Sequence, residues 1–209
     1  MSATLIDGNA VAEQINRRVA DRVKALVAAG RRVHLAAVQV GENPASKIYT
    51  NMQARSCEAV GIQYDLLTLP ADTTQDALLA EVARLNDDAA VTGIILQMPL
   101  PQQIDARKVQ VAIAPDKDVE GMHPVNMGRL FFGGGHVAPC TPLAAVELLT
   151  QTCSDLAGKE AVIVGHSEIV GKPIAAMLLA SPNASPTVTV CHVATADLVV
   201  PFAVRGVAD

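Results

Sequence analysis

Segments with helical and strand-like periodicity alternate along this chain, and this alternation constrains the fold more than any other feature. Between about 9 and 29, apolar residues recur at every fourth position, which predicts an amphipathic helix that ends at Gly30. The run 34–40 is short, apolar and followed by a glycine, as expected of a buried strand. The alternation continues with expected helices at 44–60 and from a capping residue at Thr73, and with expected strands at 62–69 and 91–97. This order predicts βαβ units, a parallel sheet and right-handed crossovers.

A loop-rich stretch from 115 to 142 interrupts the alternation. We expect the domain boundary within it, which gives one domain at 1–138 and a second at 139–209. In the second domain the pattern predicts helices at 142–153, 170–180 and 198–207 and strands at 161–165 and 187–191. The predicted fold class is therefore α/β.

The composition supports buried parallel sheets and argues against several classes of function. Half of the residues are hydrophobic and only 2% are aromatic, so aliphatic side chains must fill the core, as in strands covered on both faces. The net charge is −5 and no basic stripe is interleaved with aromatic residues, which argues against nucleic-acid binding. No apolar stretch is typical of a signal peptide or a membrane span. The four cysteines are far apart in the sequence, which favours free thiols in a reducing cytoplasm over a metal site or disulfides.

A glycine turn between an expected strand and an expected helix is the sharpest local signal. Gly165 and Gly171 flank this turn, whose geometry would direct backbone N–H groups and a helix N-terminus towards a phosphate. Their spacing differs from the usual dinucleotide fingerprint, so a plain connection between strand and helix remains an alternative. A hydrolase nucleophile at Ser167 is disfavoured because Ile169 replaces the second glycine of that motif. In addition, His192 precedes the acids Asp197 and Asp209, whereas that fold orders Ser, acid, then His. The following strand ends without an acid or an arginine, so these residues leave NAD and NADP both open.

Several motifs, in order along nearly the whole chain, resemble the methylenetetrahydrofolate dehydrogenase/cyclohydrolase family. They are 46–49 with 57–62, 93–101, 115–121, 139–142 and 165–173. The resemblance implies an N-terminal α/β domain and a Rossmann-like domain, a tetrahydrofolate derivative as substrate, NADP or NAD as cofactor, and a homodimer. It implies hydride transfer from the folate methylene carbon to the nicotinamide, followed by hydrolysis of the methenyl product.

The resemblance also assigns roles to individual residues. It places Tyr49 in the substrate wall, makes Gln97 the group that orients a catalytic lysine, and puts the pterin-anchoring acid at position 120. It places the dinucleotide at Gly165, His166, Ser167, Gly171 and Thr195. Taken without the motifs, these residues favour plainer interpretations: a core aromatic at Tyr49, a polar strand terminus at Gln97, and solvated loop acids at Asp116 and Asp118.

The sequence departs from the family pattern at positions that carry the chemistry. Gln53 replaces the lysine expected four residues after Tyr49, and a carboxamide does not titrate near neutral pH. We therefore expect a lost or weakened cyclohydrolase step, whereas hydride transfer depends more on positioning. Position 120 is Glu where the family usually has Asp. His166 and Val193 replace an arginine and a serine that many members use for NADP, which favours NAD.

The C-terminal domain resembles only the first part of the family's Rossmann-like domain. An incomplete parallel sheet would expose an unpaired strand edge and some apolar surface. We therefore expect a domain that is marginal alone or stabilised by association. A catalytically inactive fragment or paralogue that binds folate or a partner subunit is the alternative hypothesis.

Overall fold

The chain forms two compact units, which are described separately. The computed structural model describes residues 5–42, 44–134, 137–180 and 185–196. Asp7–Val119 make up the N-terminal unit, and the residues from Glu120 onwards, with the first six, make up the C-terminal unit. The expected helix at 198–207 lies outside the described residues.

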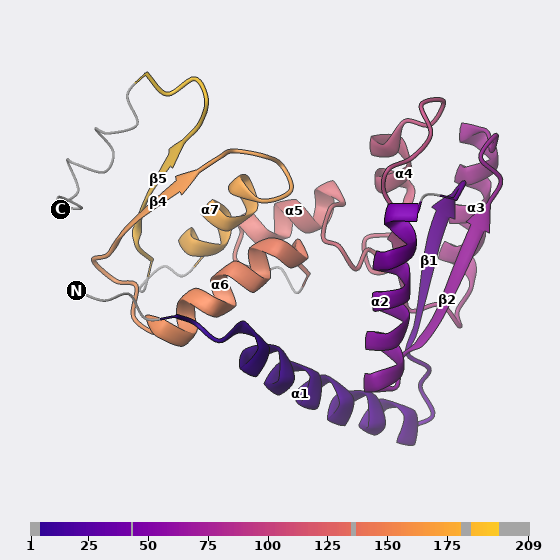
Figure 1. Cartoon of the computed structure of the whole chain (residues 1–209), viewed down its shortest axis with the longest axis horizontal. Helices are drawn as coiled ribbons and strands as arrows, with labels where there is room; N and C mark the ends of the chain where they lie inside the picture. The colour runs from indigo at the N-terminus through magenta and orange to yellow at the C-terminus, as the bar shows by residue number, and fades with distance from the viewer. Residues whose placement is uncertain (1–4, 43, 135–136, 181–184, 197–209) are drawn as a thin grey trace. The chain divides into compact units, whose positions relative to one another are not determined.

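The N-terminal unit is built from helices that alternate with parallel strands (Figure 1). Its elements are α1 (Gly8–Ala28), β1 (His34–Val40), α2 (Pro44–Val60), β2 (Gln63–Leu69), α3 (Gln75–Asp87), β3 (Gly93–Leu96) and α4 (Ala106–Ala112). The strand order is β2-β1-β3, and β1 pairs in parallel with both neighbours. The predicted parallel α/β sheet is confirmed.

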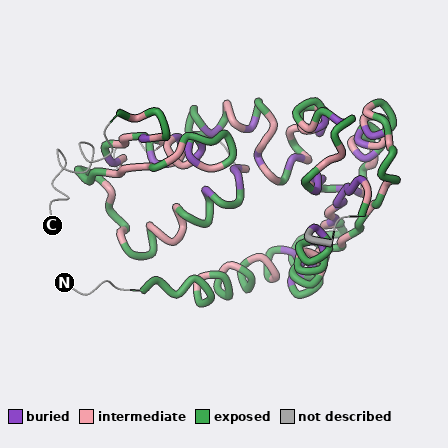
Figure 2. Tube along the Cα trace, turned by 45° about the horizontal axis from the view of Figure 1, so that its top comes forward, coloured by how far each residue is buried: buried purple, intermediate pink, exposed green. Residues whose placement is uncertain are grey.

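The two faces of β1 have different partners because successive side chains of a strand point to opposite sides. Ala36, Val38 and Val40 lie in one buried cluster with Leu78 and Val82 of α3. Val38, Leu78 and Val82 are fully buried, and most positions of β1 and β3 are buried (Figure 2). The core therefore lies between one face of the sheet and helices α3 and α4, and the opposite face of the sheet is the one that can meet α2.

The C-terminal unit contains a smaller parallel sheet. Its elements are α5 (Pro124–Phe131), α6 (Cys140–Thr152), β4 (Glu160–Val164), α7 (Gly171–Leu179) and β5 (Thr187–Cys191). β4 and β5 form a two-stranded parallel sheet with Val162 paired to Thr189. Helix α7 packs against α5, α6 and both strands. Its buried residues include Ala176, which shares a small cluster with Leu130 of α5.

The structure differs from the sequence-based expectations at three places. Thr74, and not Thr73, caps α3: the Thr74 hydroxyl accepts a hydrogen bond from the Ala77 N–H, while the Thr73 hydroxyl donates to the Pro70 carbonyl. The stretch expected to be a loop contains α5, which has Pro at its first turn and is capped by the His123 imidazole. The sequence did not predict α4 either, because seven residues are too few to show a helical period.

Packing also places residues 120–138 with the C-terminal unit, whereas the expected boundary followed residue 138. A side-chain carbon at Gly121 would lie 2.8 Å from the backbone of Ala138, so these two segments are in direct contact. Helix α5 packs on α7 within the same unit. The expected boundary was drawn at the end of a loop-rich region, but the compact units separate at its beginning.

Candidate functional site

Helix α2 carries two of the predicted site residues and is fixed to the sheet by its buried face. Ser46, Thr50, Cys57 and Val60 are buried at helical spacing. The Ser46 hydroxyl donates a hydrogen bond to the carbonyl of Met98, which follows β3, at 3.3 Å. The first turn of α2 is therefore held at the carboxyl end of the central strands, where ligands bind in open α/β sheets.

Gln53 and Gln97 are in direct contact, although 44 positions separate them in the sequence. The Gln97 carboxamide nitrogen donates a hydrogen bond to Oε1 of Gln53 at 2.8 Å. The hydroxyl of Tyr64 in β2 donates to the same oxygen at 3.3 Å. Gln97 is only 7% exposed, so it is a buried and hydrogen-bonded group rather than a solvated strand terminus. The structure therefore brings two predicted residues together and adds Tyr64, which the sequence did not single out.

This three-residue cluster is electrically neutral at neutral pH. Two members are carboxamides, which do not titrate. Burial raises the pKa of the Tyr64 phenol above its ordinary value, and the nearby Cys57 thiol raises it further. Burial likewise raises the pKa of Cys57. The cluster can therefore donate and accept hydrogen bonds, but it contains no group that exchanges a proton readily near pH 7.

Tyr49 lies one helical turn before Gln53 on α2 and is exposed. Its side chain is 67% exposed, so it is not a core aromatic. Ile48 and Met52, which flank it on the same helix, are also largely exposed. An exposed aromatic ring beside two exposed apolar side chains offers a surface on which a flat heterocycle can stack.

The loop that leads to Glu120 is anchored to the end of α3. The Lys117 ammonium donates to the carbonyls of Leu85 and Asp88 at 2.8 and 2.7 Å. The Asn86 side chain donates to the Ala112 carbonyl and accepts from the Ala114 N–H. Sequence reasoning missed both supporting roles, since neither a lysine in a polar loop nor an asparagine in the last turn of a helix shows which remote segment it will contact.

Two acids of this loop have different surroundings. Asp118 is 5% exposed, and a backbone bridge joins it to Ile94 at the start of β3. It is therefore not an ordinary solvated loop acid, whereas Asp116 is exposed as that interpretation expects. Glu120 is half-buried and belongs to the C-terminal unit, while Tyr49, Gln53 and Gln97 belong to the N-terminal unit.

The predicted glycine turn connects β4 to α7 in close contact with the helix. Gly165 has φ +126°, a backbone conformation that side chains disfavour, and its N–H donates to the Cys191 carbonyl of β5 at 2.7 Å. A side-chain carbon at Gly171 would lie 2.2 Å from the Gly165 carbonyl oxygen. The Ser167 hydroxyl accepts hydrogen bonds from the N–H groups of Val170 and Gly171. A side chain would therefore strain the backbone at Gly165 and clash with the turn at Gly171. The N-terminus of α7 lies directly beside this turn.

Two histidines meet where β4 and β5 end. The rings of His166 and His192 are 4.3 Å apart between centroids and inclined at 47°. The Thr195 hydroxyl accepts from the His192 N–H at 2.9 Å, and the Thr195 N–H donates to the His192 carbonyl at 2.8 Å. Val193 is fully exposed. The residues predicted to bind a dinucleotide therefore gather at the carboxyl ends of two parallel strands, the usual position for such a site.

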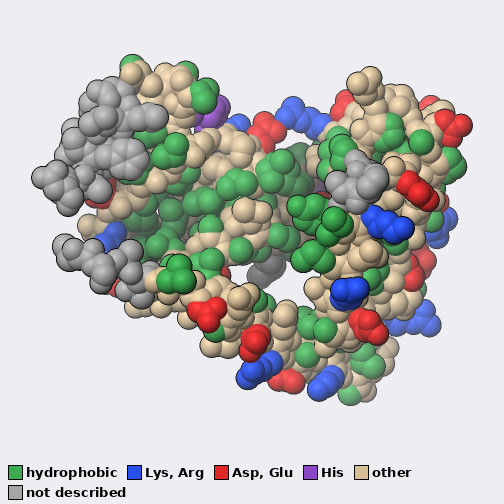
Figure 3. Space-filling model, viewed as in Figure 1, with side chains coloured by type: hydrophobic (Ala, Val, Ile, Leu, Met, Phe, Trp, Pro, Cys, Tyr) green, Lys and Arg blue, Asp and Glu red, His purple; other side chains and the backbone are tan. Residues whose placement is uncertain are grey.

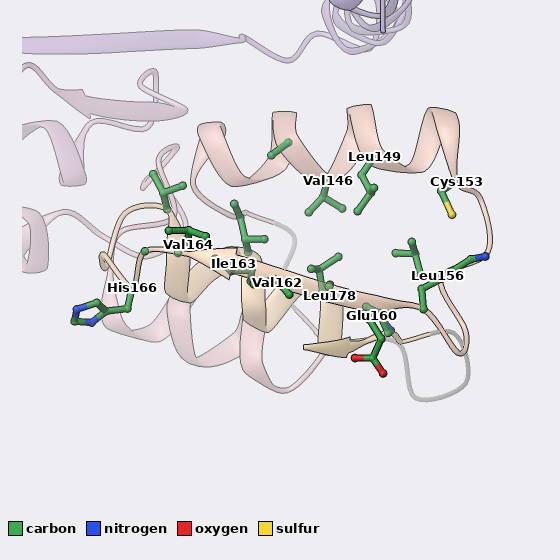
Figure 4. A pocket seen from close by; sticks show the side chains of 18 of the residues that line it. Val146, Leu149, Cys153, Leu156, Glu160, Val162, Ile163, Val164, His166 and Leu178 are labelled. Carbon is green, nitrogen blue, oxygen red and sulfur yellow. The ribbon is translucent and has the colours of Figure 1, made fainter. Parts of the chain in front are cut away.

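An apolar hollow of about 910 Å³ lies between α6 and β4 (Figure 4). It is lined by Val146 and Leu149 of α6, Val162 of β4 and Leu178 of α7, and it reaches the turn at Gly165. Within the described residues β4 pairs only with β5, and hydrophobic side chains gather over this unit (Figure 3). The sequence predicted an open strand edge with exposed apolar surface, but it could not predict the hollow, because apolar strand and helix positions normally indicate a filled core.

The described part of the chain holds neither a metal-ligand cluster nor a membrane-spanning helix. No group of three or more His, Cys, Asp or Glu side chains there could hold a metal ion. None of the described helices is both long enough and apolar enough to cross a membrane. All four cysteines are free.

Comparisons with known proteins match both parts of the chain. Residues 6–120 match the catalytic domain of tetrahydrofolate dehydrogenase/cyclohydrolase, and residues 139–203 match the NAD(P)-binding domain of the same family. The bifunctional protein FolD of Geotalea daltonii is 46% identical over 98% of this chain and 72% of its own length.

Solved structures agree with this assignment. The bifunctional enzyme FolD from Campylobacter jejuni matches with a TM-score of 0.89 and 42% identity, over 95% of this chain and 70% of that one. The Trypanosoma brucei enzyme, solved with NADP cofactor and inhibitor, matches with a TM-score of 0.83 and 36% identity, over 94% of this chain and 67% of that one. The resemblance seen in the motifs is confirmed, and the chain belongs to the tetrahydrofolate dehydrogenase/cyclohydrolase family.

Proposed function

We propose that this chain is an NAD(P)-dependent methylenetetrahydrofolate dehydrogenase whose methenyltetrahydrofolate cyclohydrolase step is impaired. The observation that carries this proposal is the neutral cluster around Gln53, where Gln97 and Tyr64 both donate hydrogen bonds to its carbonyl oxygen. The Campylobacter jejuni relative, whose name carries both activities, supports the reaction class. The family pattern has a lysine at this position, so the substitution affects one step more than the other.

The dehydrogenase step moves a hydride from the methylene carbon of the folate to the nicotinamide ring and leaves a methenyl cation. The cofactor, when bound, supplies the hydride acceptor. The chain has to hold the two reactants in contact, because correct positioning lowers the activation barrier of such reactions substantially. We assign Tyr49 to the substrate wall, Gln97 to the orientation of residue 53, and Glu120 to the anchoring of the pterin ring.

The cyclohydrolase step adds water to the methenyl carbon and opens the ring, which requires proton transfer. A positioned acid or base typically contributes about 10²–10⁴-fold to such a step. Gln53 cannot exchange a proton near neutral pH. The longer Glu120 carboxylate retains a negative charge for the pterin ring, but it does not replace an amine at position 53.

The glycine turn fits a dinucleotide. Because Gly171 has no side chain, the space beside the Gly165 carbonyl stays open. Helix α7 begins at this point. We assign the pyrophosphate to Gly165, Ser167 and Gly171, and the adenosine end to His166 and Thr195. The positive end of the α7 dipole at this point favours a negatively charged ligand of this kind.

We propose NAD as the preferred cofactor. His166 and Val193 lie at the strand ends where many family members have an arginine and a serine for the 2′-phosphate of NADP, and Val193 offers no hydrogen bond. The relative from Trypanosoma brucei was solved with NADP. Titration of this protein with NAD and NADP decides the preference, and clearly tighter binding of NADP would refute our proposal.

We further propose a cytoplasmic homodimer of a chain with a folate-binding domain and a dinucleotide-binding domain. The four free cysteines favour a reducing compartment. Among the residues that the structure describes, β4 has no second strand partner, and this edge and the apolar hollow beside it favour association of the C-terminal unit. Light scattering after size-exclusion chromatography gives the mass in solution, and a monomer at micromolar concentration would refute the dimer.

A catalytically inactive paralogue that binds folate or a partner subunit is the second candidate. The replacement of the family lysine by Gln53 favours this candidate, because a chain that has lost the cyclohydrolase step can have lost the dehydrogenase step as well. An assay with methylenetetrahydrofolate separates the candidates, run with each cofactor and with the methenyl and formyl products separated by chromatography. Reduced cofactor with accumulating methenyl product supports the dehydrogenase, whereas folded protein with no turnover supports the inactive paralogue.

A further inference from the structure

Tyr64 lies on the face of the sheet that meets α2, although it belongs to no family motif in this chain. In β2 it pairs with Leu35 of β1, so both side chains lie on the face opposite the one that carries Ala36 and Val38. The same alternation puts Gln97 on the α2 side, because Ile94 and Leu96 lie in the core cluster. The sheet register therefore directs Tyr64 and Gln97 towards one turn of α2, where they meet Gln53.

The hydrogen bonds fix which end of the Gln53 side chain faces the cluster. Its Oε1 atom accepts two hydrogen bonds, from Gln97 at 2.8 Å and from Tyr64 at 3.3 Å. A carbonyl oxygen has two lone pairs, so its accepting capacity is filled. The amino group at the other end of the same carboxamide keeps two N–H donors for a ligand.

The Tyr64 phenol is suited to this donor role. It is half-buried against α2, and it remains protonated over the range in which an enzyme of this kind would be assayed. Its oxygen carries a single hydrogen, and that hydrogen is directed at Gln53. Loss of the hydroxyl would leave the Gln53 carboxamide held by one donor only, so that the carboxamide could rotate.

We propose that Tyr64 is a positioning residue for the folate site: with Gln97 it locks the Gln53 carboxamide so that its amino group acts as a neutral hydrogen-bond donor to the folate. This inference rests on the proposed function. It gives Gln53 a positive role in substrate orientation, so that residue 53 binds the folate even though it transfers no proton.

A double-mutant cycle on the full chain tests this role. Tyr64→Phe removes only the hydroxyl, and Gln53→Ala removes the group that it positions. We expect Tyr64→Phe to raise the KM for methylenetetrahydrofolate and the Kd for tetrahydrofolate about three-fold, the effect of one modest net hydrogen bond. In the Gln53→Ala background the same change should alter neither value, because there is no carboxamide left to orient.

Matched controls separate positioning from a loss of stability. Thr68→Val removes an exposed hydroxyl from the same strand and should leave KM and Kd unchanged. Thermal unfolding of each variant checks that the sheet is intact. An equal effect of Tyr64→Phe with and without Gln53 would overturn the proposal, because it would show a purely structural role.

The two readouts also distinguish failure of this inference from failure of the proposed function. Absence of turnover in the unaltered protein refutes the dehydrogenase, but a Kd for tetrahydrofolate that responds to Tyr64→Phe only when Gln53 is present still supports the positioning role. Turnover with no change in KM or Kd on Tyr64→Phe overturns the inference and leaves the dehydrogenase standing. Absence of any folate binding by folded protein overturns both.

Discussion

Restoring the family lysine at position 53 is the most informative perturbation of this protein. In Gln53→Lys an ammonium with three donors replaces a carboxamide whose oxygen accepts two hydrogen bonds. Gln97 can turn its side chain so that Oε1, in place of the nitrogen, faces residue 53 at a similar distance. The Tyr64 oxygen, which donates to Gln53, can instead accept a hydrogen bond from the ammonium. The surrounding cluster therefore satisfies a lysine after rotation of one side chain.

The magnitude follows from the chemistry that the amine restores. Residue 53 is half-buried, so the ammonium keeps part of its hydration, and we expect the free energy of unfolding to change by no more than about 1 kcal/mol. Proton transfer by a positioned group is worth about 10²–10⁴-fold, which corresponds to about 3–5 kcal/mol of barrier. Gln53→Lys should raise the rate of methenyltetrahydrofolate hydrolysis by at least about 10²-fold.

The assay follows the decay of methenyltetrahydrofolate directly, so it requires no nicotinamide cofactor and isolates the second step. Gln14→Lys, the same change at an exposed position of α1, is the matched control and should leave the rate unaltered. A folded Gln53→Lys variant with no gain in hydrolysis would refute the argument that a missing proton carrier limits this step. It would direct attention to Glu120, whose longer side chain is the other departure in the folate site.

Three further predictions concern the cofactor site and the core. Gly171→Ala should abolish dinucleotide binding, measured by titration calorimetry, because its new carbon would lie 2.2 Å from the Gly165 carbonyl; Gly128→Ala in α5, where nothing lies within 4 Å, is the control and should bind normally. His166→Arg should strengthen NADP binding by about ten-fold without a similar gain for NAD, in a salt-dependent manner, because a guanidinium binds phosphate strongly; equal gains for both cofactors would contradict the assignment of His166. Leu78→Ala should destabilise the N-terminal unit by about 2–5 kcal/mol in urea unfolding, since Leu78 is fully buried, and a loss below 1 kcal/mol would contradict its place in the core.

Local patterns in the sequence determined the elements and the family. The alternation of helical and strand periods predicted the parallel sheet, and the strand at His34–Val40 and the helix at Pro44–Val60 lie where the pattern put them. Gly30 and Gly61 have positive φ at the ends of α1 and α2, as a helix stop requires. Periodicity and glycine conformation are properties of neighbouring residues, so a single sequence reveals them. The motif order likewise identified the family, and with it the contact partners Gln53 and Gln97.

The tertiary structure alone decided which side chains meet. The contact of Tyr64 with Gln53 depends on the register of β2 against β1 and on the rotation of α2 over the sheet, and neither is encoded in any short segment. The anchoring of Lys117 to the end of α3 and the packing of α5 on α7 also join segments remote in the sequence. The apolar hollow beside β4 depends on how α6 and α7 pack around this strand. The sequence therefore determined the framework and the altered chemistry at position 53, while packing between elements determined how that residue is held.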